Sequence, residues 1–162
     1  MTLQKKATVV SSLVAFLLAC IKLIFGVISG SVAVLASAID SLLDLGISLF
    51  NYFAIKNAEK PADDTFNYGR GKIEGIAGVT EGIIIAASGL FIFYQSIQNI
   101  IDNQKLTSLN SSLTVMVISF LITLGLVLFL NYVAKKTDNI VIKADALHYK
   151  TDLYSNAVIL IS

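Results

Sequence analysis

The stretch SVAVLASAIDSLLDLGISLFNYFAI, residues 31–55, is an almost unbroken apolar run that nevertheless contains two aspartates, Asp40 and Asp44. It exceeds the roughly 20 residues that an α-helix needs to cross the hydrocarbon core of a bilayer. Comparable apolar stretches lie on both sides of it. Together they predict five membrane spans, at residues 7–29, 31–55, 73–101, 109–134 and 140–162. The expected fold is therefore all-α, a polytopic transmembrane helix bundle.

The composition excludes several classes of protein. Of the 162 residues, 56% are hydrophobic and only 14% are charged, whereas soluble domains are about 25% charged. An ordinary water-soluble enzyme and a disordered chain are both excluded. The net charge of +1 gives no basis for a nucleic-acid partner. The single cysteine excludes a disulfide framework and a cysteine-rich metal site.

The basic residues predict an orientation in the membrane. Nine of the 12 Lys and Arg residues flank the predicted spans on one side, and only Lys105 lies on the other. The nine are Lys5, Lys6, Lys56, Lys60, Arg70, Lys72, Lys135, Lys136 and Lys143. Because basic residues concentrate on the cytoplasmic side, we expect a multi-pass protein of the cell membrane with a cytoplasmic N-terminus.

Ionisable residues inside the predicted spans are the candidate functional residues, because they are costly to place in lipid. Asp40 and Asp44 form one pair and His148 and Asp152 another, each with the i, i+4 spacing that puts both side chains on one helix face. Counted from the same side of the membrane, the two pairs lie at matching depth. Three carboxylates and an imidazole suit a divalent cation such as Zn²⁺, and the same groups bind protons when the metal leaves.

Other interpretations of these residues remain open at this point. An intramembrane aspartate also serves as a hydrogen-bond partner between helices, and an Asp–His pair also serves as a proton relay. Glu81 fits an accessory cation or proton site, or a buried contact between helices. Asp145, three residues before His148, fits either a support for that side chain or an acid of the cytoplasmic vestibule.

Several longer motifs, in this order along the chain, resemble the cation diffusion facilitator family, in particular its bacterial iron/zinc-type members. They are GSVAVLASAIDSLLD at residues 30–44, KPADD at 60–64, YGRGKIE at 68–74 and KADALHYKTD at 143–152. The family has six transmembrane helices and usually a C-terminal cytoplasmic domain. The resemblance therefore implies that the sixth helix and that domain are absent here, in keeping with the apolar run that ends at Ser162.

The resemblance also implies a function. Members are homodimers that export divalent metal in exchange for protons by alternating access, and their transport site corresponds here to Asp40, Asp44, His148 and Asp152. This donor set implies Zn²⁺, or Fe²⁺, Cd²⁺ or Co²⁺, as a transported substrate rather than a prosthetic group. Some relatives hold a second metal in the loop, but the matching positions read Asp63, Phe66 and Arg70. Since Phe and Arg do not ligate metal, no loop site is expected.

The sequence argues against an enzyme and leaves two alternatives to transport. A metalloenzyme with an H-E-x-x-H motif needs two histidines, and His148 is the only one in the chain, so we do not expect an enzyme. The main alternative is a membrane metal-binding or regulatory subunit that does not transport. A channel is a further alternative, distinguished by conductance that is independent of a proton gradient.

Overall fold

The protein folds into five α-helices in the computed structural model, which describes residues 2–30, 32–101 and 109–161. The helices are α1 (Leu3–Ser29), α2 (Val32–Ala58), α3 (Lys72–Ile101), α4 (Leu109–Thr137) and α5 (Ile140–Ile161). The described residues contain no strand, which confirms the all-α prediction. The helices coincide with the five predicted apolar stretches. Polar residues extend α1 by one turn at its start, and α2 and α4 by one turn at their ends.

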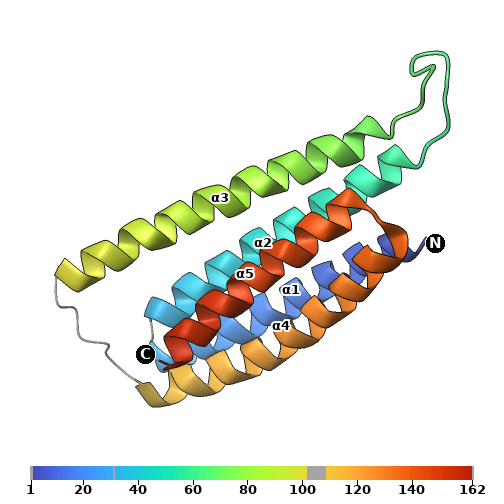
Figure 1. The fold of residues 1–162 in the computed structure, drawn as a ribbon. Helices are drawn as coiled ribbons and strands as arrows, with labels where there is room; N and C mark the ends of the chain where they lie inside the picture. Colours follow the sequence, from blue (N-terminus) through green and yellow to red (C-terminus); the bar gives the residue numbers. More distant parts are fainter. Residues whose placement is uncertain (1, 31, 102–108, 162) are drawn as a thin grey trace.

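Successive helices run in opposite directions along the bundle (Figure 1). Helices α1 and α2 pack against each other, and α5 contacts each of the other four helices. Helix α3 contacts α2 and α5 and lies at the edge of the bundle in Figure 1. One end of the bundle holds the starts of α1, α3 and α5 and the ends of α2 and α4. We call it the basic end, because all nine clustered Lys and Arg residues lie at or near it.

The connection from α4 to α5 is a two-residue turn with clear local causes. Asp138 has a φ of 53°, a left-handed conformation that closes a helix C-terminus. Asn139 then caps α5, because its Oδ1 accepts the backbone N–H groups of Val141 (3.0 Å) and Ile142 (3.2 Å). Its Nδ2 donates to Glu74 on α3 at 2.8 Å. One side chain thus starts α5 and sets its position beside α3.

The surface of the bundle is suited to lipid. Over the described residues, helices α1 to α4 are long and apolar enough to cross a membrane. Large apolar side chains on their outer faces are exposed, among them Leu13, Phe16, Leu43 and Ile83. Helix α5, the fifth predicted span, carries four charged residues, Lys143, Asp145, Lys150 and Asp152. Asp145 is buried between α5 and α2, whereas Lys143 and Lys150 are exposed.

Gly78 lies at a close contact of α3 with α5. A Cβ at this position would lie 2.7 Å from Cγ2 of Ile140, whereas a Cβ at Gly75, three residues earlier, would meet nothing within 4 Å. Small residues of this kind let helices pack closely in membranes. Among the glycines of α3, Gly78 is the position at which a larger side chain is excluded.

We expect Gly78→Ala to destabilise the protein by about 1–3 kcal/mol, because overpacking forces the neighbouring helix to move. Gly75→Ala is the matched control, and it should be neutral or stabilising by up to about 1 kcal/mol through helix propensity. Thermal unfolding in the same detergent compares the two variants. Equal stability of the two would show that α3 and α5 are not in close contact here.

Candidate metal site

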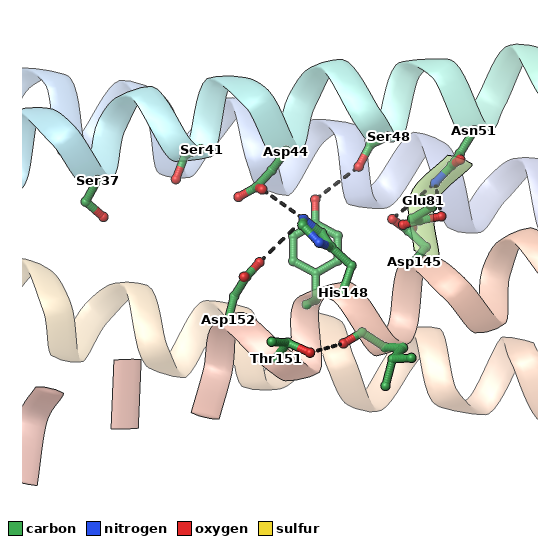
Figure 2. A network of polar contacts seen from close by, with 12 residues as sticks. Ser37, Ser41, Asp44, Ser48, Asn51, Glu81, Asp145, His148, Thr151 and Asp152 are labelled. Carbon is green, nitrogen blue, oxygen red and sulfur yellow. Dashed lines mark hydrogen bonds and ion pairs between the residues drawn. The ribbon is translucent and has the colours of Figure 1, made fainter. Parts of the chain in front are cut away.

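Three ionisable side chains from two helices meet inside the bundle. Asp44 on α2 and His148 and Asp152 on α5 each offer a ligand atom, and these atoms all lie within 4.8 Å of one another. Nε2 of His148 is 3.0 Å from Oδ1 of Asp44 and 3.6 Å from Oδ2 of Asp152. The imidazole thus lies between two carboxylates, as Figure 2 shows. We refer to these three residues as the triad.

Neighbouring contacts hold the triad in register. Tyr149 is buried next to His148, and its ring meets the imidazole edge-on with centroids 5.6 Å apart. Its hydroxyl is 3.0 Å from Oγ of Ser48, one turn beyond Asp44 on α2. This buried hydrogen bond joins α2 and α5 immediately beside the triad. A slip of either helix by one residue would break it, so the contact fixes which faces of the two helices meet.

Asp40, the fourth predicted ligand, lies outside the group of three. It is on α2, one turn before Asp44, and its side chain is exposed. The nearby ammonium of Lys22, on α1, is buried and donates to Oγ of Ser41 at 2.9 Å and to the carbonyl oxygen of Ser37 at 3.3 Å. The sequence therefore selected three residues that the fold brings together and one that it places on the adjoining turn.

A second polar cluster lies beside the triad, toward the basic end. It consists of Asn51 on α2, Glu81 on α3 and Asp145 on α5, all at most 1% exposed. Nδ2 of Asn51 donates to Oε2 of Glu81 at 3.1 Å and to Oδ1 of Asp145 at 3.4 Å. Figure 2 shows the two carboxylates side by side next to the amide. We call these residues the inner acidic cluster.

The loop positions that the resemblance associates with a further metal site bind one another instead. Nη2 of Arg70 lies 2.6 Å from Oδ2 of Asp63, and its guanidinium lies over the Phe66 ring, 4.2 Å from the centroid. The backbone N–H of Phe66 also donates to Oδ1 of Asp63 at 2.8 Å. The absence of a loop metal site stays a prediction, but these three side chains already have a common structural role.

Sequence reasoning missed the uncharged members of the two sites. Asn51, Ser48 and Tyr149 each make a buried hydrogen bond between α2 and another helix. The sequence carries a weak signal for two of them. Ser48 follows Asp44 by four residues and Asn51 follows Asp44 by seven, so all three side chains lie on the same face of the helix. Charged residues in an apolar span are candidate functional residues because they are costly there, whereas serine and asparagine also serve as ordinary hydrogen-bond partners between membrane helices.

Comparison with known proteins gives a consistent family match. Residues 8–162 match the family described as the cation efflux transmembrane domain. The chain is 34% identical over 160 residues to the cation-efflux pump FieF of Escherichia coli O139:H28, which is 99% of this chain and 53% of that protein. It is 36% identical over 160 residues to FieF of Salmonella arizonae, with the same coverage. The chain thus spans about half the length of the curated relatives it matches.

The contacts among Asp63, Phe66 and Arg70 predict that the stability of the loop depends on pH, with a definite sign. The hydrogen bond from the Phe66 backbone, followed by that from Arg70, lowers the pKa of Asp63 below its usual value. The stabilisation from these bonds is therefore complete above the usual aspartate pKa, near 4, and is lost as the pH falls through the lowered value. At neutral pH, Asp63→Asn should accelerate hydrogen exchange severalfold in residues 63–70.

Asp64→Asn is the matched control for the loop, because it removes the same charge from an exposed neighbour. Hydrogen exchange followed by mass spectrometry measures both variants in the same detergent. Equal acceleration in the two variants would mean that net charge, rather than the contacts of Asp63 with Phe66 and Arg70, orders the loop.

Proposed function

The chain belongs to the cation diffusion facilitator family of cation efflux proteins, and from this premise we propose that it transports a divalent metal ion through the triad. The observation that carries the proposal is the convergence of Asp44, His148 and Asp152 within 4.8 Å inside a bundle of membrane-spanning helices. The relatives are cation-efflux pumps by name. Because the chain spans about half of their length, we propose transport for this chain and do not carry it over from the relatives.

The chemistry of the donors favours a zinc-like ion. Zinc accepts imidazole nitrogen and carboxylate oxygen at about 2.0–2.2 Å in tetrahedral geometry. In the structure, Nε2 of His148 already faces both carboxylates, and Oδ2 of Asp152 is buried without a hydrogen-bond partner among the described residues. A cation between the three side chains would satisfy that oxygen and offset the two negative charges. Fe²⁺, Cd²⁺ and Co²⁺ accept the same donors.

Asp40 is the fourth ligand that we propose. It lies one turn before Asp44 on α2, so the two side chains project from the same helix face. Its exposure leaves it free to change rotamer without disturbing a packed core. A metal ion bound by the triad would gain a fourth oxygen when Asp40 turns toward it, and would lose that oxygen when Asp40 turns away.

Exchange of metal for protons follows from the same set of groups. With the metal absent, a proton on His148 offsets part of the carboxylate charge through its contacts with Asp44 and Asp152. With the metal bound, that proton must leave, because Nε2 has a single lone pair. We therefore propose a metal/proton antiporter that works by alternating access. We further propose that it acts as a homodimer in the cell membrane, with the basic end in the cytoplasm.

Zinc flux into liposomes under an imposed pH gradient tests the proposal. For the full-length protein, we expect Asp44→Asn and Asp152→Asn to reduce the flux by at least about 100-fold, because each removes a charged ligand. Asp138→Asn is the matched control. It makes the same Asp-to-Asn change in the α4–α5 turn, where Asp138 pairs with Lys143, and this variant should retain flux. Unchanged flux in Asp44→Asn would refute the assignment of the triad.

Two further measurements separate the alternatives. His148→Ala should weaken zinc transport and relax discrimination against Mn²⁺, which prefers oxygen ligands. Stoichiometric zinc binding without any flux in the wild type would support the non-transporting metal-binding subunit instead. Conductance that does not respond to the proton gradient would support a channel.

A further inference from the structure

We propose that the inner acidic cluster of Asn51, Glu81 and Asp145 is a second divalent-cation site, which holds the ion between the basic end and the triad. The proposal rests on the proposed function for its role in transport. The cation binding itself is a separate property of these three side chains. It follows from their burial, their unsatisfied oxygens and their place along the bundle.

Too few donors serve this cluster for the acceptors that it buries. Two carboxylates and an amide contribute five oxygens, and the Asn51 amide nitrogen supplies one donor group to each carboxylate. Oδ1 of Asn51, Oε1 of Glu81 and Oδ2 of Asp145 are buried with no hydrogen-bond partner among the described residues. Each comes from a different helix. Buried acceptors without partners, and buried carboxylates without a cation, are strongly unfavourable.

No basic side chain of the described part of the chain pairs with these carboxylates. The ion pairs made there by Lys or Arg are Lys5–Glu59, Arg70–Asp63 and Lys143–Asp138, all at the basic end. The hydroxyl of Ser11 on α1 has two acceptors within hydrogen-bonding range, Asp145 and the carbonyl oxygen of Thr8 at 3.1 Å, and it can donate to only one of them at a time. A divalent cation would offset both carboxylate charges and give the unsatisfied oxygens a common partner. One shared proton would offset a single charge.

Asn51 can exchange a donor for an acceptor at this position. Its NH₂ group now lies between the two carboxylates, within hydrogen-bonding distance of both, and so occupies the place of a cation. Rotation of the amide by half a turn would present Oδ1 to the same point. The cluster then offers three oxygen ligands, a donor set that suits cations preferring oxygen, such as Mn²⁺.

The position of the cluster gives the site its role. On α2, Asn51 is seven residues beyond Asp44, which is about 10 Å along a helix, and it is seven residues from the end of α2 at Ala58. On α5, Asp145 is one turn before His148. The cluster therefore lies between the basic end and the triad, and it adds α3 to the two helices that form the triad. An ion passing from the basic end to the triad would meet this cluster first.

Counting bound Mn²⁺ tests the site without reference to transport. In the full-length protein with the triad disabled by Asp44→Asn and Asp152→Asn, electron paramagnetic resonance should detect one bound Mn²⁺. Adding Glu81→Gln or Asp145→Asn should weaken that binding by at least about tenfold, because ligand charge sets affinity. Adding Glu74→Gln is the matched control on α3, and it should leave Mn²⁺ binding unchanged because glutamine keeps an oxygen that accepts the hydrogen bond from Asn139.

A change of opposite sign guards against misfolding. In the triad-disabled protein, Asn51→Asp adds a third carboxylate, so it should tighten Mn²⁺ binding by at least about tenfold and make the melting temperature rise more on Mn²⁺ addition than it does without this substitution. If the cluster were only a hydrogen-bond network or a proton site, Asn51→Asp would destabilise the protein and Mn²⁺ would not restore it. That result, or no bound Mn²⁺ at millimolar concentration in the triad-disabled protein, would overturn the proposal.

The proposed function and this inference fail in different ways. If the inner acidic cluster binds no cation, the triad is unaffected, and Asp44→Asn would still reduce zinc flux. If the triad does not transport zinc, the triad-disabled protein would still bind Mn²⁺, and Glu81→Gln would still weaken that binding. If both proposals hold, Glu81→Gln in an otherwise wild-type protein should raise the zinc concentration needed for half-maximal flux severalfold.

Discussion

Polar atoms that are buried among apolar helices need partners, and this constraint shapes the interior of the protein. Many large apolar side chains are exposed on the outer faces of the helices, whereas the buried carboxylates and amides gather where helices meet. Two such gatherings dominate, the triad and the inner acidic cluster. Both include residues of α2 and α5. Helices α2 and α5 meet through polar side chains because the charged residues of both sites lie between them. Neighbouring helices pack around this contact, which keeps the charged groups away from lipid.

The least apolar helix is the one that contacts each of the other four. Helix α5 carries His148, Asp145 and Asp152 and contacts all four other helices. Asn139 caps the first turn of α5, and the tertiary contact between the hydroxyl of Tyr149 and Ser48 sets the rotation of this helix. These neutral contacts do not bind metal in our proposals. They place the ligating atoms within a few ångströms of one another, which is what coordination requires.

The sequence predicted much of this arrangement, for identifiable reasons. Apolar length predicted the helices, and the i, i+4 spacing of His148 and Asp152 predicted that both side chains share a face, which the structure shows. Matching depth predicted the meeting of Asp44 with His148. Asp40 was chosen by the same rule, yet it lies outside the group, because spacing along a helix does not specify the rotamer or the distance to a second helix. Glu81 and Asp145 were noted separately, and nothing in the sequence paired them.

By itself, the sequence determined the secondary structure, the apolar surface and the types of ligand available, because these depend on local composition and on helix periodicity. Only the tertiary structure decided which polar residues share a partner. Asn51 is 30 residues from Glu81 and 94 residues from Asp145 in the sequence, yet its amide donates a hydrogen bond to each of them. Their meeting depends on the crossing of three helices and on the close approach allowed at Gly78. Side-chain packing between helices sets those quantities, and periodicity within one helix does not encode them.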